Sequence, residues 1–180
     1  PAVSLVADAD FPVCLGEKGS LDFELSCPVD SARLVDFRAG SATNMVPSQA
    51  FALLDGVDCG QVRTRMRDVA CWSVIQAGRY VKVATGGLGG HAAFPAGTQS
   101  PVPMLAQLLL DSGLIEDGSA LAALRFLRDT YRTCLGEPFG LDVRDEDYGF
   151  TTHVCGLVRM RAGTLYQTVN VRYVPSVDCE

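Results

Sequence analysis

Alternating apolar and polar residues predict that strands make up much of this 180-residue chain. In residues 16–27, Leu21, Phe23 and Leu25 fall on one face, as in a strand that is half buried against a core. The same pattern predicts five further strands, at 34–38, 44–53, 79–84, 150–160 and 164–173. The last two are separated only by a short turn sequence that contains glycine, so we expect them to form a hairpin.

Apolar residues three and four positions apart predict helices between these strands. The spacing of Val62, Met66, Val69 and Ser73 predicts a helix over residues 58–76. A second helix is expected to begin after Ser100, which is followed by proline, and a third is expected to begin at Ser119. The order of the elements predicts an α+β fold, in which helices cover one face of an antiparallel sheet.

The composition narrows the classes of partner. The formal net charge is −6, which disfavours nucleic acids and anionic membrane surfaces as main partners. No run of about 18 apolar residues occurs, so we expect no transmembrane helix. The first residue is Pro1 rather than methionine, and we therefore expect the chain to be a fragment of a longer protein.

Cysteine usage indicates a reducing compartment. The chain has seven cysteines, an odd number, and none is spaced as Cys-x-x-Cys. Such thiols are typical of cytoplasmic proteins, in which cysteine behaves as a small core residue. Cys155 lies two residues from His153, but this spacing alone gives a thiol no positioned base, and we expect Cys155 to be structural.

Residues 86–97 form the segment with the clearest chemical potential. Five glycines surround His91 there, directly after a predicted strand. Glycine tolerates left-handed backbone angles and close approach of other atoms, so a histidine at this place can reach a reacting group. The chain has only two histidines, and the other is His153.

Four segments, in chain order, resemble the lid domain of zinc peptidases of the aminoacylase/carboxypeptidase/carnosinase superfamily. They are Asp-Ala-Asp-Phe-Pro-Val-Cys-Leu-Gly-Glu-Lys-Gly at 8–19, Gly-Ser-Ala-Thr-Asn-Met-Val-Pro-Ser-Gln-Ala at 40–50, Gly-His-Ala-Ala-Phe-Pro-Ala-Gly at 90–97 and Asn-Val-Arg-Tyr at 170–173. The nearest group is the bacterial Xaa-His dipeptidase type. The resemblance implies ferredoxin-like lobes, either one or two similar lobes side by side, within a single lid domain over residues 1–180.

The chain departs from the family pattern in two places, and it lacks the family's metal ligands. Val174 intervenes before the proline that follows the last motif, and Thr-His-Val-Cys-Gly at 152–156 replaces a Leu-Thr-x-Asn-x-Gly strand. In the superfamily, two zinc ions are held by a His-x-Asp pair, a bridging aspartate, a Glu-Glu pair and a distant histidine. This chain has no His-x-Asp and no Glu-Glu, so no metal ligand is expected in it. The two zinc ions are expected in a catalytic domain that lies outside this chain.

The resemblance implies roles for three residues. His91 would donate a hydrogen bond to the substrate carbonyl, while Arg172 and Asn44 would bind the substrate carboxylate. Each has a simpler alternative: a histidine in a glycine-rich loop, a solvated strand arginine, and an asparagine that satisfies its own turn.

The implied function is that of a substrate-capping lid in a zinc-dependent dipeptidase, inactive as a separate segment. Its partners would be the catalytic domain of the same parent chain and a small dipeptide, with the parent either a monomer or a lid-mediated dimer. Two alternatives remain open at this point: a stand-alone ferredoxin-like binding or oligomerisation module, and the lid of a peptidase homologue that has lost zinc ligands. The closeness of Pro1 and Glu180 would favour an inserted domain.

Overall fold

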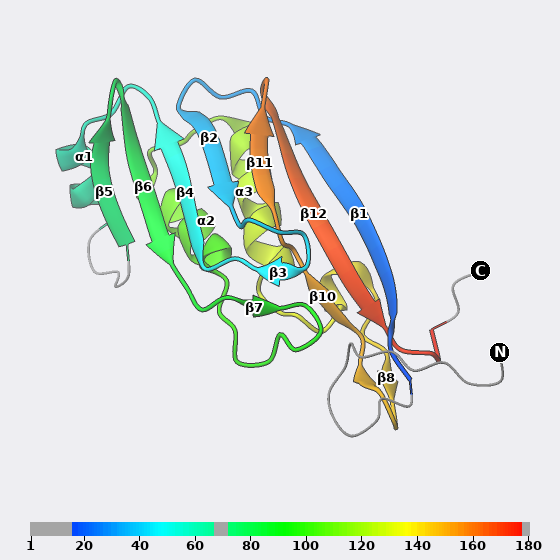
Figure 1. Ribbon diagram of the computed structural model, residues 1–180. Coiled ribbons are helices and arrows are strands. Elements are labelled where there is room, and N and C mark those ends of the chain that lie inside the picture. Colours follow the sequence, from blue (N-terminus) through cyan, green and yellow to red (C-terminus); the bar gives the residue numbers. More distant parts are fainter. Residues whose placement is uncertain (1–15, 67–71, 178–180) are drawn as a thin grey trace.

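One antiparallel sheet runs through the computed structural model, which describes residues 16–66 and 72–177 (Figure 1). The strands lie in the order β1-β12-β11-β2-β4-β6-β5, and β10 pairs with the C-terminal end of β12. Two small ribbons, β3 with β7 and β8 with β9, lie outside this sheet. The strands are β1 (Gly19–Pro28), β2 (Leu34–Ala39), β3 (Met45–Val46), β4 (Gln49–Leu54), β5 (Trp72–Ala77), β6 (Tyr80–Gly86), β7 (Gly90–His91), β8 (Arg144–Asp145), β9 (Gly149–Phe150), β10 (Thr152–Val154), β11 (Val158–Arg161) and β12 (Thr164–Tyr173).

The helices contribute to one hydrophobic core with the sheet. Figure 1 shows α2 and α3 together behind the central strands. Phe37 of the sheet and Leu105 and Leu124 of these helices are completely buried in this core, and burial of each such side chain contributes about 1.5–3 kcal/mol. The predicted α+β fold with helices on one face is therefore confirmed. The helices are α1 (Cys59–Arg65), α2 (Pro101–Ser112) and α3 (Gly118–Thr130), with a short 3-10 helix, η1 (Glu137–Phe139).

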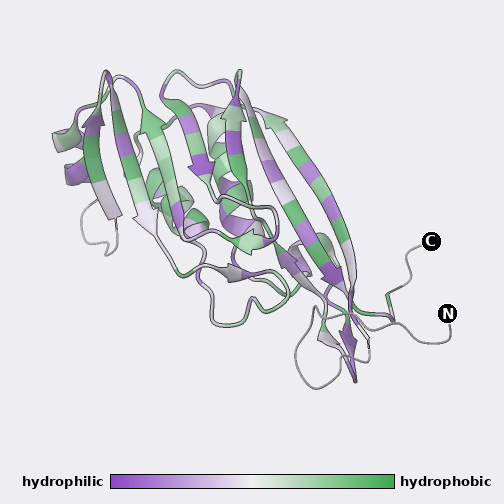
Figure 2. Ribbon diagram, viewed as in Figure 1, coloured by the Kyte–Doolittle hydropathy of each residue, from purple (hydrophilic) through white to green (hydrophobic). Residues whose placement is uncertain are grey.

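The opposite face of the central strands is open to solvent. Along β4, Ala50, Ala52 and Leu54 are buried against the helices, whereas Gln49 is exposed and Phe51 is only half-buried. Figure 2 shows this alternation as apolar and polar bands along the long strands. The period of two in the sequence thus separates a core face from an open face.

The signals at the ends of α2 and at the start of α3 mark these boundaries to within a residue. The Ser100 side chain accepts a hydrogen bond from the Val102 N–H, and Gly113 ends α2 in the left-handed conformation. The third helix begins at Gly118, one residue before the predicted start at Ser119. None of the helices in residues 16–66 and 72–177 has the length and apolar character of a membrane span.

The predicted helix over 58–76 is wrong in its second half. Asp58 and Gln61 form a reciprocal capping box at the start of α1, but the helix ends at Met66. Trp72 begins β5, which pairs with β6 along its whole length. Pairing with β6 and burial of Val74 outweigh the local helical spacing.

Two predicted strands are interrupted. In the predicted strand 44–53, Pro47 separates β3 from β4, because proline has no N–H to donate to a ladder. In the predicted strand 150–160, Gly156 lies between β10 and β11. A Cβ at Gly156 would stand 2.2 Å from the Thr43 carbonyl oxygen, so Gly156 lies directly against the segment 40–43 that precedes β3. Residues 135–149 contain η1 and β8.

This contact predicts a large destabilisation by Gly40→Ala. Gly40 has φ +73°, and a Cβ there would lie 1.8 Å from the Gly156 carbonyl oxygen. We expect a loss of about 2–5 kcal/mol in the free energy of unfolding, from backbone strain and overpacking together. Gly78→Ala is the matched control, because Gly78 has φ +63° with no atom within 4 Å of the added Cβ. Its loss should be only about 1 kcal/mol. Equal losses in urea unfolding of the two variants would contradict the contact.

Candidate functional site

The ribbon of β3 and β7 carries two of the three predicted site residues. Met45 lies opposite His91, and Val46 lies opposite Gly90. Beneath the ribbon, Val46 and Ala92 pack with Val154 of β10 in a small buried cluster. The ribbon is therefore held by its inner face, and His91 is exposed on the outer one.

Asn44 and His91 contact each other. The Asn44 Nδ2 lies 3.2 Å from the His91 Nε2, and the Asn44 carbonyl accepts a hydrogen bond from the Ala92 N–H at 2.9 Å. On the other side of the ring, the His91 Nδ1 accepts a hydrogen bond from the Ala93 N–H at 3.1 Å. A neutral imidazole that accepts at Nδ1 carries its proton on Nε2. The Asn44 amide, which can present either end, then turns its oxygen to that proton. The site thus holds an N–H donor whose partner is the Asn44 amide.

Arg172 lies on β12 between β1 and β10, opposite Ser20 and Thr152. Its two neighbours in sequence face the core, so its side chain lies on the open face. The Arg172 Nε donates to the Asn170 Oδ1 at 3.1 Å, and the Asn170 Nδ2 donates to the Asp22 Oδ1 at 2.8 Å. This chain of hydrogen bonds fixes the stem of the guanidinium and leaves the terminal nitrogens free of hydrogen bonds to the described residues.

The structure brings Asn44 and His91 together and connects Arg172 to them through β10. Thr152 pairs with Arg172 across the β10–β12 ladder. Its hydroxyl also donates to the carbonyl of Ala92, the residue after His91, at 3.4 Å. The three predicted residues therefore belong to neighbouring elements, although Arg172 makes no hydrogen bond to the other two.

Sequence reasoning missed Thr152 and Asn170. Both are buried, with 7% and 1% of their surface exposed, and both make the hydrogen bonds described above. The available signal was a polar residue between the apolar residues of a strand, because a buried polar side chain needs a hydrogen-bond partner.

His153 and Cys155 form part of a buried network. The His153 Nδ1 accepts from the Gly136 N–H at 3.0 Å, and its Nε2 donates to the Thr130 carbonyl at 3.0 Å. The Gln167 Nε2 donates to the Cys155 Sγ at 2.8 Å. Burial raises the pKa of the Cys155 thiol to about 12, which keeps it protonated and unreactive. Both ring nitrogens of His153 are used, so the pair is structural, as predicted.

Comparison with known proteins finds one relevant similarity. The chain is similar to a protein of Bacillus subtilis (strain 168) named "Putative dipeptidase YtjP", with 27% identity over 189 residues. The alignment covers 96% of this chain and 40% of the Bacillus protein, so the chain spans less than half of that protein's length. No family model matches the chain.

The buried imidazole predicts a loss of stability in mild acid. Burial lowers the pKa of His153 below its usual range, so below about pH 6.5 the unfolded chain binds a proton that the folded chain does not. The free energy of unfolding should therefore fall as the pH falls from 7 to 5.5. His153→Gln should make this decline shallower, and should cost about 1–3 kcal/mol at pH 7.5 because buried partners are left unsatisfied.

The wild-type chain, which keeps the buried imidazole, gives the reference decline. Urea unfolding at several pH values gives both slopes. An unchanged slope in His153→Gln would contradict the assignment.

Proposed function

We propose that this chain is the substrate-capping lid of a zinc-dependent dipeptidase-like hydrolase. The observation that carries the proposal is the contact between Asn44 and His91 on an exposed ribbon, in which the His91 Nε2 faces an amide that a ligand can replace. The similarity to a protein named as a dipeptidase supports the same class of reaction.

His91 would stabilise the transition state of peptide hydrolysis. The substrate carbonyl oxygen gains negative charge when the carbon becomes tetrahedral, and a donor held in advance at that place contributes about 2.7–4 kcal/mol. The Ala93 N–H keeps the His91 proton on Nε2, where it can be donated. Asn44 would hold the ring until the substrate oxygen replaces the amide as the partner of this proton.

Arg172 would bind the C-terminal carboxylate of a dipeptide. Within the described residues, only its Nε is hydrogen-bonded, to Asn170, so the two terminal nitrogens can form the paired hydrogen bonds that a carboxylate accepts. Because Thr152 connects β10 both to Arg172 and to the ribbon, the carboxylate and the scissile carbonyl would be bound at neighbouring places.

The metal chemistry would come from outside this chain. Among residues 16–66 and 72–177, no three His, Cys, Asp or Glu side chains lie close enough to share a metal ion. In the proposal, two zinc ions in the parent's catalytic domain supply an activated water, and this chain supplies the contacts to the substrate. The lid's closure would exclude bulk water from the reacting groups.

The pairing of the first and last long strands supports an inserted domain. Gly19 of β1 lies opposite Tyr173 of β12, so the chain enters and leaves the sheet at adjacent places. The first motif, at 8–19, lies largely outside the described residues, as do Pro1 and Glu180.

His91→Ala in the full-length protein should lower kcat for dipeptide hydrolysis by about 100- to 1000-fold, because a transition-state donor is lost. KM should change much less, since the ground-state carbonyl carries little of the charge. Steady-state kinetics with zinc present measure both constants. A full-length wild-type protein that hydrolyses no dipeptide would contradict the proposed function itself.

Arg172→Met should raise KM for dipeptides with a free carboxylate by about 10-fold or more, because a charge-assisted pair is lost. It should also abolish the preference for a free dipeptide over its C-terminal amide. Arg161→Met, at an exposed arginine on the neighbouring strand β11, is the matched control and should keep that preference. A preference that survives in Arg172→Met would show that the carboxylate binds elsewhere.

A further inference from the structure

The sheet is joined at its centre by a narrow seam. Strands β2 and β11 share one residue pair, Val158 opposite Ala39, whereas the neighbouring strands pair over several residues. The chain leaves β2 directly after this pair and enters the segment 40–43, which leads to Asn44. Where this ladder ends, the carbonyls of Ala39 and Gly40 can take side-chain donors as partners.

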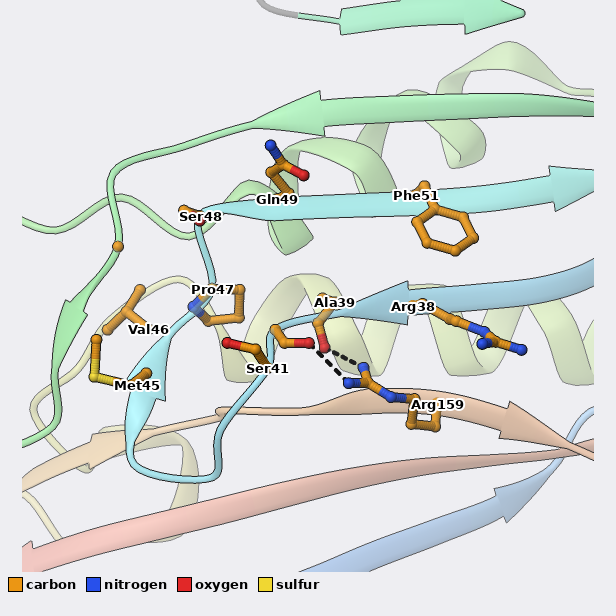
Figure 3. Close-up of a pocket in the computed structure, with 12 residues that line it drawn as sticks. Arg38, Ala39, Ser41, Met45, Val46, Pro47, Ser48, Gln49, Phe51 and Arg159 are labelled. Atoms are coloured by element: carbon orange, nitrogen blue, oxygen red, sulfur yellow. Dashed lines mark hydrogen bonds between the residues drawn. The ribbon is translucent and has the colours of Figure 1, made fainter.

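Arg159 supplies these partners. Its Nη1 donates to the carbonyls of Ala39 and, at 2.6 Å, Val158, and its Nη2 donates to the Gly40 carbonyl at 2.7 Å. Figure 3 shows the guanidinium directed at the end of β2, at the edge of a cavity of about 750 Å³ on the open face. The planar guanidinium can serve several acceptors at once, which a lysine ammonium does with less fixed geometry.

The segment 40–43, which connects the end of β2 to Asn44, is tightly packed. A Cβ on Gly156 would lie 2.4 Å from the Ala42 carbonyl oxygen and 2.2 Å from that of Thr43, so this segment rests directly on the Gly156 backbone. Gly156 is held in turn by the next residue, Leu157, which exchanges two hydrogen bonds of 3.0 Å with Thr168 of β12. Movement at the end of β2 would therefore be transmitted along the segment to Asn44.

We infer that Arg159 is a positioning residue for the Asn44–His91 pair. It fixes the start of the segment 40–43, the hydrogen bond from the Ala92 N–H to the Asn44 carbonyl fixes its end, and the Asn44 side chain is thereby held 3.2 Å from the His91 Nε2. The positioning rests on contacts in this chain, and its consequence for catalysis rests on the function proposed above.

Two other arginines on the open face do not have this role. Arg38 forms an ion pair with Asp36, in which its Nε donates to the Asp36 Oδ2 at 2.6 Å, and its side chain is 52% exposed. Arg161 is exposed at the end of β11, beyond the seam. Arg161→Met is therefore the matched control for Arg159→Met, since it removes the same group two residues away on the same face.

The test is nuclear magnetic resonance of the 180-residue chain, which has only two histidines. Nuclear Overhauser effects between the Asn44 side-chain amide and the His91 ring report the contact directly. We expect them in the wild type and in Arg161→Met, and we expect their loss in Arg159→Met. Nuclear Overhauser effects between β1 and β12 should persist in all three proteins, as should those of the buried His153 ring. They show that the sheet is intact.

Three results would overturn the inference. The first is a full set of Asn44–His91 effects in Arg159→Met. The second is loss of the same effects in Arg161→Met. If Arg159→Met does not fold, Arg159→Lys is tested in its place. Partial loss of the Asn44–His91 effects with an intact sheet supports the positioning role. The third overturning result is loss of the whole fold in Arg159→Lys, which shows a general structural role.

Kinetics of the full-length protein separate this inference from the proposed function. Arg159→Met should lower kcat/KM for dipeptides by up to about 100-fold through misplacement of the pair, and Arg159→Lys should recover part of it. Loss of the Asn44–His91 effects together with unchanged hydrolysis would leave the positioning role in place and refute the catalytic role of the pair. Intact effects would refute the positioning role whatever the activity.

Discussion

Backbone groups at the end of β2 have to find hydrogen-bond partners, and the rest of the site depends on how they do so. A buried carbonyl without a partner costs about 1–3 kcal/mol, comparable with a large fraction of a domain's net stability. At the end of β2, a side chain on β11 replaces the missing ladder. Because that side chain belongs to the other half of the sheet, the segment that leaves β2 is fixed relative to both halves.

The same requirement determines the chemistry of the exposed imidazole. The Ala93 N–H needs an acceptor where β7 ends, and the His91 Nδ1 provides it. The consequence is a proton on Nε2, with Asn44 as its partner. A hydrogen bond that satisfies a backbone N–H of this loop thus also orients the donor. The glycines allow the loop to approach β3, because a Cβ at Gly89 would stand 2.8 Å from the Val46 carbonyl oxygen.

Much of the fold could be predicted from local patterns, because period-two burial and helix caps act over a few residues. β1, β6, β12 and α2 follow their predictions closely. The failures occur where long-range contacts decide. Residues 72–77 form a strand because β6 lies beside them, and residues 45–46 leave the main sheet because Pro47 cannot continue it. Asn44, His91 and Arg172 were identified through resemblance, but the connection through Thr152 depends on which strands meet in space.

The two histidines show why residue type alone does not identify a functional site. His153 uses both ring nitrogens on backbone groups and is 2% exposed, so it has no nitrogen left for a ligand. His91 uses one nitrogen on the backbone and the other on a side-chain amide that can be displaced. The Asn44 amide is the easier of these partners to replace, because a hydrogen bond to a developing oxyanion is stronger than one to a neutral amide. Disruption of the His153 hydrogen bonds would instead leave buried groups unsatisfied. In the function proposed above, the capacity to bind a substrate would therefore lie in the replaceable partner, and the location of Asn44 would matter as much as the imidazole itself.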